Sequence, residues 1–403
     1  MNVMIKQSWI KIFKGWLLSY ILIDAITFFT RIIESLFSKD HKIITIFFTD
    51  LNFSDNSRYF LEYLSSNNDH NYNVNILVKN KSLYDEIVLE YPKNTYYSLS
   101  FSGLVLFLKT KNIVISNGSD SSYFFPYFLD INCKNIINLW HGIPLKRLSL
   151  QVKIIRESKS RNRFQKFSSI CVASTFEQFL MASCFDMHID DIWVTGTPRN
   201  DYLLNPNNDL INKHEYLNKK VILYAPTWRE YGKSSLFFPF KDKNLEDLNA
   251  FLEKEDAYLL IRGHSEDIVR IKESYSNQKL SRILSANQDV FPDTQRLLSH
   301  VDILVTDYSS IYLDFLLLDK PIIFIPYDFE EYQSYRGFLY DYKSHTPGNK
   351  VSSQVEFIES LEKGINNPDF GSLERQRLKN LFHKYQDTNS SKRIILKINQ
   401  MNS

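Results

Sequence analysis

The stretch DILVTDYSSIYLDFLLLDKPIIFIPYD, residues 302–328, contains the alternation that decides the fold. A short apolar run (302–305) leads into the polar turn TDYSS (306–310), and an apolar-striped segment that we predict to be helical follows. A second apolar run (321–326) comes next. Continuous apolar strands separated by helices are typical of parallel sheets that are covered on both faces. The segment therefore predicts an α/β fold.

The same alternation extends through most of the chain. Further strands are predicted at 42–48, 74–78, 112–116, 135–139, 171–174 and 191–196, and then at 221–226, 257–262 and 282–284. A polar stretch, LNPNNDLINKHEYLNK (204–219), separates the two series. We therefore predict two domains, 41–205 and 219–395, whose sheets face each other across a cleft. Ligands of such sheets bind beyond the carboxyl ends of the strands.

Composition limits the classes of partner. The 403 residues are 44% hydrophobic and carry a net charge of +2, so the chain as a whole is not a nucleic-acid binder. Eight basic residues nevertheless lie between Lys146 and Lys166 against one acid, Glu157. This run is either a solvated helix face or a surface that attracts anionic lipid or a pyrophosphate-bearing acceptor. Three cysteines without CxxC spacing indicate a reducing cytosol and no zinc site.

The N-terminal segment, residues 1–40, differs in character from the rest. It carries Trp9, Trp16 and early lysines among apolar residues, but its longest uncharged stretch (15–23) has only nine residues. A membrane-spanning helix needs about 20 apolar residues. We therefore predict an amphipathic helix that lies on the membrane surface, while a packed soluble helix and a true span remain the alternatives.

The TDYSS turn is a candidate anion site. The first N–H groups of the helix that follows have no partner within the helix, and the helix dipole is positive there. Together with the hydroxyls of Ser309 and Ser310, this start could hold a diphosphate. The alternative is that one serine only caps the helix, which is a common role for serine.

Two histidines follow predicted strands and adjoin glycines: His141 in NLWHGIPLK and His264 in YLLIRGHSED. We interpret His141 as a general base in a confined, partly dry pocket beside Trp140. Arg262 and His264 could together bind a phosphate. Either histidine could instead be structural, as most histidines at strand ends are.

Two further turns offer weaker candidates for substrate binding. TGTPRND contains Arg199, and YAPTWRE contains Thr227 and Arg229. An arginine paired with an aspartate at a turn is usually structural, so each motif alone proves little. Neither GxGxxG nor GxxxxGK[ST] occurs, nor does an HExxH or EF-hand pattern, and nothing calls for a metal or another cofactor.

Taken in order, WHGIPLK, GTPRND, LYAPTWR, RGHS, TDYSS and YRGFLYDY resemble the motifs of the CDP-glycerol glycerophosphotransferase family, over about residues 42–395. The resemblance implies a GT-B-like fold with an acceptor-side and a CDP-donor-binding Rossmann-like domain. It also implies peripheral attachment to the cytoplasmic face of the membrane and no metal requirement. The expected reaction transfers a polyol phosphate, glycerol 3-phosphate first, from its CDP ester to a hydroxyl of a lipid-linked glycan or polymer. This belongs to teichoic acid or capsule synthesis and releases CMP.

The resemblance also assigns roles to residues. His141 would be the base, His264 a phosphate contact, and TDYSS the holder of the CDP diphosphate, while the family's late arginine would be Arg393. The chain departs from the family at Thr388, where glycine is usual, at Ile143, where many relatives have threonine, and at Ser265, where they have proline. The alternatives are an inverting glycosyltransferase that uses a nucleotide sugar and a non-catalytic scaffold of a polysaccharide export complex.

Overall fold

The computed structural model describes residues 32–48, 53–67, 69–117, 133–152, 167–207, 209–227, 229, 237–263 and 280–403. Three predictions fall outside these residues. They are the amphipathic helix over most of residues 1–40, the basic run from 153 to 166, and the role of His264. Within the described part, no helix is long and apolar enough to cross a membrane.

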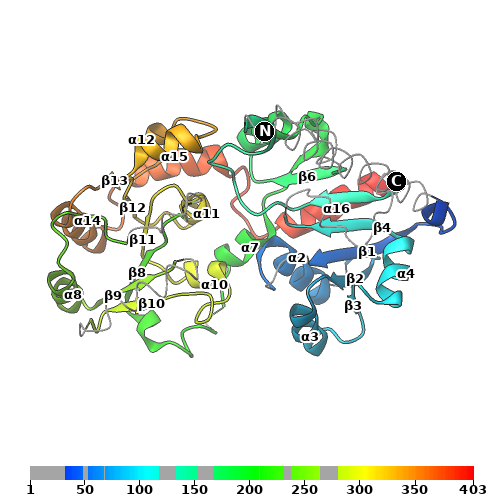
Figure 1. The fold of residues 1–403 in the computed structure, drawn as a ribbon, viewed down its shortest axis with the longest axis horizontal. Helices are drawn as coiled ribbons and strands as arrows, with labels where there is room; N and C mark the ends of the chain where they lie inside the picture. The colour runs from blue at the N-terminus through cyan, green and yellow to red at the C-terminus, as the bar shows by residue number, and fades with distance from the viewer. Residues whose placement is uncertain are drawn as a thin grey trace, which may run out of the picture. The chain divides into compact units, whose positions relative to one another are not determined.

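The first sheet has seven strands in the order β3-β2-β1-β4-β5-β6-β7 (Figure 1). Their bounds are β1 Asp40–Phe48, β2 Asn73–Val78, β3 Thr95–Tyr97, β4 Thr110–Ile115, β5 Asn135–Asn138, β6 Ser169–Val172 and β7 Ile192–Val194. The pairings β1–β2, β1–β4, β2–β3, β4–β5 and β6–β7 are parallel. β3 is not among the strands predicted from the sequence, because three residues are too few for a periodic signal.

The second sheet has six parallel strands in the order β10-β9-β8-β11-β12-β13. Their bounds are β8 Lys220–Tyr224, β9 Ala257–Ile261, β10 Ile283–Ser285, β11 Ile303–Thr306, β12 Ile322–Phe324 and β13 Asn349–Lys350. The central strands β8, β9 and β11 are almost entirely buried, which explains their continuous apolar sequences. β13 is also not among the predicted strands, because it consists of two polar residues at the sheet edge.

Helices occupy the segments between the strands. The longer ones are α2 Asp55–Ser66, α3 Lys81–Glu90, α4 Phe101–Lys109, α6 Thr175–Phe185, α8 Leu245–Lys254, α14 Gln354–Asn366, α15 Ser372–Phe382 and α16 Ser390–Asn402. The shorter ones are α7 Pro198–Leu204, α10 Thr294–Leu298, α11 Ile311–Phe315, α12 Phe329–Tyr335 and α13 Tyr342–His345. The helix predicted after TDYSS is therefore short: α11 passes into a 3₁₀ turn, Leu316–Leu318, which ends at Asp319 with φ 50°. Parallel sheets interleaved with helices confirm the α/β class.

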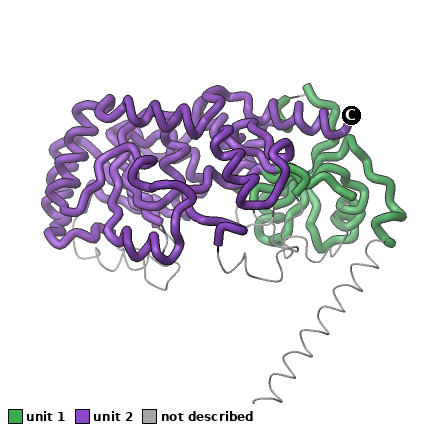
Figure 2. Tube along the Cα trace, turned by 90° about the horizontal axis from the view of Figure 1, so that it is seen from above, with its two compact units in different colours: residues 1–53, 64–138, 159–169 green, residues 54–63, 139–158, 170–403 purple. Residues whose placement is uncertain are grey.

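The chain forms two compact units, each assembled from separated stretches (Figure 2). Unit 1 comprises Met1–Phe53, Leu64–Asn138 and Lys159–Ser169, and unit 2 comprises Ser54–Tyr63, Leu139–Ser158 and Ile170–Ser403. The core of unit 2 contains two large apolar clusters that include residues of β8 and β11, among them Leu223 and Leu304 in one and Ile222 and Ile303 in the other. The linear domain bounds 41–205 and 219–395, and the cleft between two facing sheets, stay predictions.

Two of the quoted motifs lie side by side within unit 2. Leu339 donates its N–H to the carbonyl of Leu145 at 3.0 Å, and Arg147 donates to the carbonyl of Gly337 at 3.2 Å. Gly337 has φ +66°, and a β-carbon there would meet the Arg147 side chain at 2.9 Å. The glycine therefore permits both the turn and the close approach of the WHGIPLK and YRGFLYDY segments.

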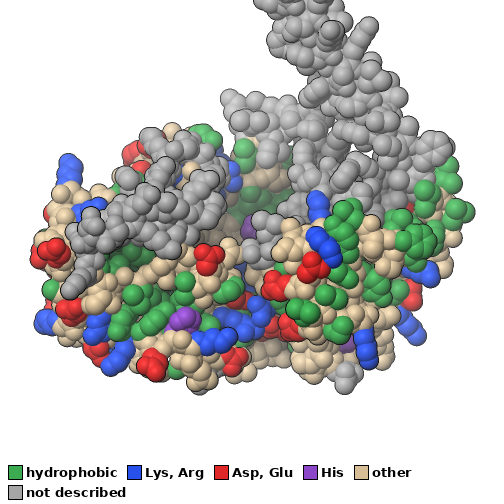
Figure 3. Space-filling view, turned by 60° about the horizontal axis from the view of Figure 1, so that its bottom comes forward, with side chains coloured by type: hydrophobic (Ala, Val, Ile, Leu, Met, Phe, Trp, Pro, Cys, Tyr) green, Lys and Arg blue, Asp and Glu red, His purple; other side chains and the backbone are tan. Residues whose placement is uncertain are grey.

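Charges of both signs are spread over the surface. On the face shown in Figure 3, Lys and Arg side chains are interspersed with Asp and Glu side chains. This distribution agrees with the small net charge of +2.

Candidate functional site

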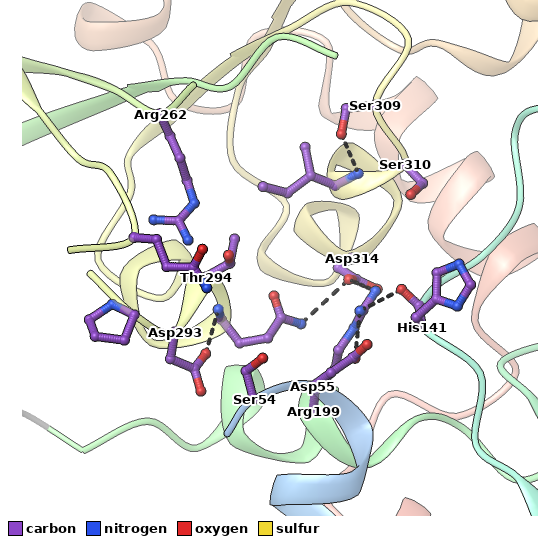
Figure 4. A pocket seen from close by; sticks show the side chains of 14 residues that line it. Ser54, Asp55, His141, Arg199, Arg262, Asp293, Thr294, Ser309, Ser310 and Asp314 are labelled. Carbon is purple, nitrogen blue, oxygen red and sulfur yellow. Dashed lines mark hydrogen bonds and ion pairs between the residues drawn. The ribbon is translucent and has the colours of Figure 1, made fainter. Parts of the chain in front are cut away.

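One pocket in unit 2, of about 420 Å³, gathers residues from several motifs (Figure 4). Five predicted site residues line it: His141, Arg199, Arg262, Ser309 and Ser310. His141, Arg262 and Ser309 each lie just beyond the carboxyl end of a strand, namely β5, β9 and β11. Strand ends are where ligands of parallel sheets bind, so the motif positions and the pocket agree.

His141 lies in a tight turn with unusual backbone angles. Trp140 has φ +57°, which is strained for a residue with a bulky side chain, and such strain is concentrated at functional sites. Gly142 has φ +131°, which glycine adopts readily. The imidazole lies against the indole of Trp140, with ring centroids 4.4 Å apart. Trp140 is buried but His141 is exposed, so the prediction of a confined, partly dry environment for this histidine is wrong. An exposed ring can be reached directly by a substrate hydroxyl.

Arg199 connects three segments of the site. Its Nη1 donates to the backbone carbonyl of His141 at 2.7 Å and to Oδ1 of Asp55 at 2.9 Å, and its Nη2 donates to Oδ2 of Asp314 at 2.5 Å. Burial opposes the charge of Arg199, but Asp314 and Asp55 outweigh burial and raise the guanidinium pKa. Arg199 therefore holds the His141 turn through the backbone, whereas its own charge is neutralised by two carboxylates.

Asp314 completes this arrangement from α11. Its Oδ1 accepts from Nδ2 of Asn200 at 3.1 Å, and its Oδ2 also lies 3.4 Å from Nε2 of Gln295. Neither Asp314 nor Asp55 is among the residues predicted for the site. Both lie within residues 42–395, the range of the resemblance, but in none of the six motifs quoted for it. Which arginine they would meet could not be read from spacing.

The part of the pocket lined by Arg262, Ser309 and Ser310 is suited to an anion. Arg262 donates from Nη1 to the carbonyls of Ala286 at 2.8 Å and Phe291 at 2.9 Å. Within the described residues, its Nε and Nη2 have no hydrogen-bond partner, and burial lowers its pKa despite Asp293 nearby. Ser309 and Ser310 line the same pocket, and Ser309 Oγ accepts a long bond of 3.4 Å from the N–H of Ile311. This part offers donors that a phosphate could use.

Four predicted contacts are buried and do not line the pocket: Thr227, Arg229, Thr306 and Asp307. Asp307 accepts from the N–H of Thr227 at 2.8 Å and pairs with Arg229 at 2.9 Å. Arg229 also pairs with Asp328 at 2.8 Å, and Thr306 donates to the carbonyl of Ala225 at 2.7 Å. These bonds stabilise the TDYSS turn from the protein interior. Direct substrate contact by the four residues stays a prediction.

Arg393 also lies away from the pocket. It pairs with Asp387, donates to the carbonyl of Thr195 at 3.2 Å and stacks on Tyr385 with its guanidinium carbon 3.6 Å from the ring centroid. Asp201 accepts from the N–H groups of the first two residues of α16, both at 3.0 Å. The GTPRND motif thus binds the C-terminal helix, and a role for Arg393 with substrate stays a prediction.

Gly142 offers a test of the Arg199–His141 contact. A β-carbon at this position would collide with Nη2 of Arg199, so Gly142→Ala is expected to lower catalytic turnover at least about tenfold by displacing the arginine. Gly371→Ala is the matched control, because φ there is also left-handed (+76°) but the nearest atom lies 3.6 Å from the added carbon. Both variants should lose about 1 kcal/mol of stability from the left-handed backbone, and Gly142→Ala should lose more, because the displaced Nη2 of Arg199 is the atom that pairs with Asp314. Equal activities of the two variants would contradict the role of this contact.

Glu177 is a buried carboxyl beside the Arg199 network. Burial, reinforced by Asp314, raises the pKa of Glu177 to about 8, although its hydrogen bond from the N–H of Ala173 at 2.7 Å opposes the shift. The folded protein therefore retains this proton at pH values where an unfolded chain has lost it.

The raised pKa of Glu177 predicts a pH-dependent stability. Its contribution is fully present below the unfolded pKa near 4.5 and is lost as the pH rises through about 8. We expect the free energy of unfolding to fall by about 1 kcal/mol between pH 6 and pH 7, as measured by urea denaturation. Glu177→Gln should flatten this slope, and an unchanged slope in that variant would rule out Glu177 as its source.

The chain matches a known protein family over most of its length. A family model described as CDP-Glycerol:Poly(glycerophosphate) glycerophosphotransferase matches residues 27–400. The chain is 31% identical over 251 residues to a teichoic acid glycerol-phosphate transferase of Staphylococcus aureus (strain NCTC 8325 / PS 47), covering 56% of this chain and 61% of that protein. It is 31% identical over 252 residues to a teichoic acid poly(glycerol phosphate) polymerase of Bacillus subtilis (strain 168), covering 58% of this chain but only 33% of that one. These two matches thus span less than two thirds of either relative.

A further relative is similar over nearly its whole length. A teichoic acid glycerol-phosphate primase of Bacillus subtilis (strain 168) is 28% identical over 86% of this chain and 89% of its own. Among solved structures, the wall teichoic acid polymerase TagF superposes with a TM-score of 0.71 at 23% identity, covering 90% of each chain. A putative UDP-N-acetylglucosamine 2-epimerase from Listeria monocytogenes superposes at 0.58 with 13% identity, covering 90% of this chain and 97% of that one. At these identities the structural likeness concerns the fold alone.

Proposed function

The chain belongs to the CDP-glycerol:poly(glycerophosphate) glycerophosphotransferase family, and on that premise we propose that it transfers a polyol phosphate, glycerol 3-phosphate first, from its CDP ester. The acceptor is a hydroxyl of a membrane-linked glycan or polyol-phosphate polymer, and CMP is released. The names of the relatives favour teichoic acid synthesis as the setting, and capsule synthesis is the related alternative.

One observation carries the proposal: the same pocket is lined by an exposed histidine and by a guanidinium whose Nε and Nη2 have no hydrogen-bond partner among the described residues. His141 is solvent-accessible, whereas Arg262 has partners only at Nη1 among the described residues. Ser309 and Ser310 add hydroxyl donors to the lining. A base and an anion-binding wall in one cavity of about 420 Å³ are the parts that phosphoryl transfer needs.

The proposed step uses these residues as follows. His141 accepts the proton of the acceptor hydroxyl while that oxygen attacks the phosphorus that carries the glycerol. A new P–O bond forms, the bond between this phosphorus and the oxygen bridging to the cytidine-bearing phosphate breaks, and CMP leaves with the bridging oxygen. Arg262, Ser309 and Ser310 stabilise the negative charge on the phosphates during the displacement. His264, outside the described residues, is proposed to assist as a second phosphate contact.

Attachment to an anionic membrane surface at the cytoplasmic face is part of the proposal. It rests on the amphipathic sequence of residues 1–40 and on the basic run 146–166. Sedimentation with vesicles tests it, because binding to anionic vesicles should exceed binding to zwitterionic ones and weaken with added salt. Equal recovery with both vesicle types would count against this attachment.

Identification of the released nucleotide tests the reaction itself. Purified protein should release CMP when it is incubated with CDP-glycerol and a membrane-linked acceptor, and CDP-ribitol and nucleotide sugars serve as comparison donors. Release of a nucleoside diphosphate from a nucleotide sugar would instead indicate the glycosyltransferase. No turnover of any donor, together with no thermal shift on adding CDP-glycerol, would indicate the non-catalytic scaffold.

A further inference from the structure

Asp55 is a carboxylate in the pocket that the mechanism above does not use. It is the first residue of α2, its side chain is 23% exposed, and it lines the same cavity as His141. Its φ of 65° places it in the left-handed region, which costs free energy for any residue other than glycine. A strained residue that faces a ligand pocket is a candidate for a specific contact with the ligand.

The neighbouring residue fixes Asp55 in place. Asn56 is fully buried and donates from Nδ2 to the carbonyls of Trp140 at 2.7 Å and Leu139 at 3.2 Å. Its Oδ1 accepts from the backbone N–H of Arg199 at 3.0 Å. Asn56 therefore holds the start of α2 against the two residues that precede His141.

The two oxygens of Asp55 have different surroundings. Oδ1 accepts from Nη1 of Arg199 at 2.9 Å, and the same nitrogen donates to the backbone carbonyl of His141 at 2.7 Å. Oδ1 also accepts from the N–H of Asn56 at 2.8 Å. Within the described residues, Oδ2 has no hydrogen-bond partner. An ionised carboxylate only accepts hydrogen bonds and repels phosphate, so Oδ2 is suited to a hydroxyl donor.

We propose that Asp55 binds a second hydroxyl of the acceptor, adjacent to the hydroxyl that His141 deprotonates. Asp55 and His141 line the same pocket, and Nη1 of Arg199 donates both to the Asp55 carboxylate and to the backbone carbonyl of His141, so the proposed polyol terminus spans these two residues. The phosphates of the donor are excluded from this part of the pocket by charge and lie toward Arg262. The inference rests on the proposed function and adds its acceptor class: a chain end that carries a vicinal diol.

Two synthetic acceptors test this role. Both acceptors begin with the same alkyl-linked glycerol phosphate unit and differ only at the terminal unit. The first ends in a glycerol phosphate, which carries a vicinal diol. The second ends in a 1,3-propanediol phosphate, which lacks the second hydroxyl. For the wild-type protein, kcat/KM for CMP release should be about 10- to 100-fold lower with the propanediol terminus, because a hydrogen bond to a charged group is lost. Because this comparison uses only the wild-type protein, its result does not depend on whether a variant folds.

Asp55→Asn then separates recognition from positioning. An asparagine can present its amide oxygen to Arg199 and place an NH₂ group, which cannot accept, where Oδ2 was. This variant should lose activity with the glycerol terminus, show nearly equal kcat/KM with both acceptors, and keep the wild-type KM for CDP-glycerol. Asp314→Asn is the matched control, because it disturbs Arg199 from its other side and should slow both acceptors by the same factor.

The outcomes distinguish the two proposals. Equal CMP release from both acceptors by the wild-type protein would overturn the role of Asp55 while leaving polyol-phosphate transfer intact. A preserved acceptor ratio in Asp55→Asn would also overturn it, because the residue would then act only through Arg199. Failure of the wild-type protein to release CMP with either acceptor would overturn the proposed function and this inference with it.

Discussion

Replacing His141 with alanine is expected to reduce CMP release from CDP-glycerol by about 10²- to 10⁴-fold, the usual contribution of a general base. The ring is exposed and rests on Trp140, so its removal leaves no cavity in the core. The melting temperature should therefore remain near that of the wild-type protein. Steady-state kinetics with one donor and one acceptor, together with a thermal melt, measure both effects.

His188→Ala is the matched control for this experiment. His188 is also exposed, at 72% of its side chain, and its imidazole contacts Asp190 rather than the pocket. Its removal should leave CMP release within about twofold of the wild-type rate, because surface substitutions away from special features have small effects. If the two alanine variants retained similar activity, His141 could not be the base.

Arg199→Leu is expected to be the most destabilising single substitution in the site. Asp314 has a side chain only 4% exposed, and the substitution leaves its carboxylate without a cation, although Asn200 and Gln295 still donate to it. Breaking a buried pair in this way costs about 3–5 kcal/mol. Urea denaturation should show this loss, and activity should fall because the carbonyl of His141 also loses its donor.

Two comparisons make the Arg199 result specific. Arg199→Lys keeps the positive charge but lacks the planar fork that spans Asp55, Asp314 and the His141 carbonyl. Compared with Arg199→Leu, it should therefore recover more of the lost stability than of the lost activity. Lys219→Leu removes an exposed pair with Asp256, in which the two side chains are 50% and 53% exposed, and should cost less than about 1 kcal/mol. Equal stability losses for Arg199→Leu and Lys219→Leu would contradict the buried network.

Much of the fold could be predicted because burial on both faces gives the central strands continuous apolar sequences. The strands of the second sheet that pack on both faces, such as β8 and β11, are continuous apolar runs, whereas β3 and β13 were missed because they are short and lie at the sheet edges. The candidate site was predicted in part for a related reason. His141, Arg262 and Ser309 follow strands directly, so the parallel topology already indicates where they should lie.

The roles of charged residues could not be predicted in the same way. Arg199 and Arg229 have similar settings in sequence, each in a short motif after a strand, yet Arg199 lines the pocket and Arg229 is buried between Asp307 and Asp328. The environment of His141 was also predicted wrongly, because a neighbouring tryptophan does not reveal which of the two rings is covered. In each case the deciding quantity is the solvent exposure of a side chain, which depends on segments far away along the chain.

The amino-acid sequence alone determined the α/β class, the parallel strands and the family, because local apolar runs and ordered motifs are properties of short segments. Only the tertiary structure decided that Asp55, His141, Arg199 and Asp314 meet. Pairing of charges over a few ångströms depends on how α2, α7 and α11 pack around the strand ends, and no spacing within the sequence encodes that packing. The balance of two carboxylates around one guanidinium is therefore a property of the folded chain.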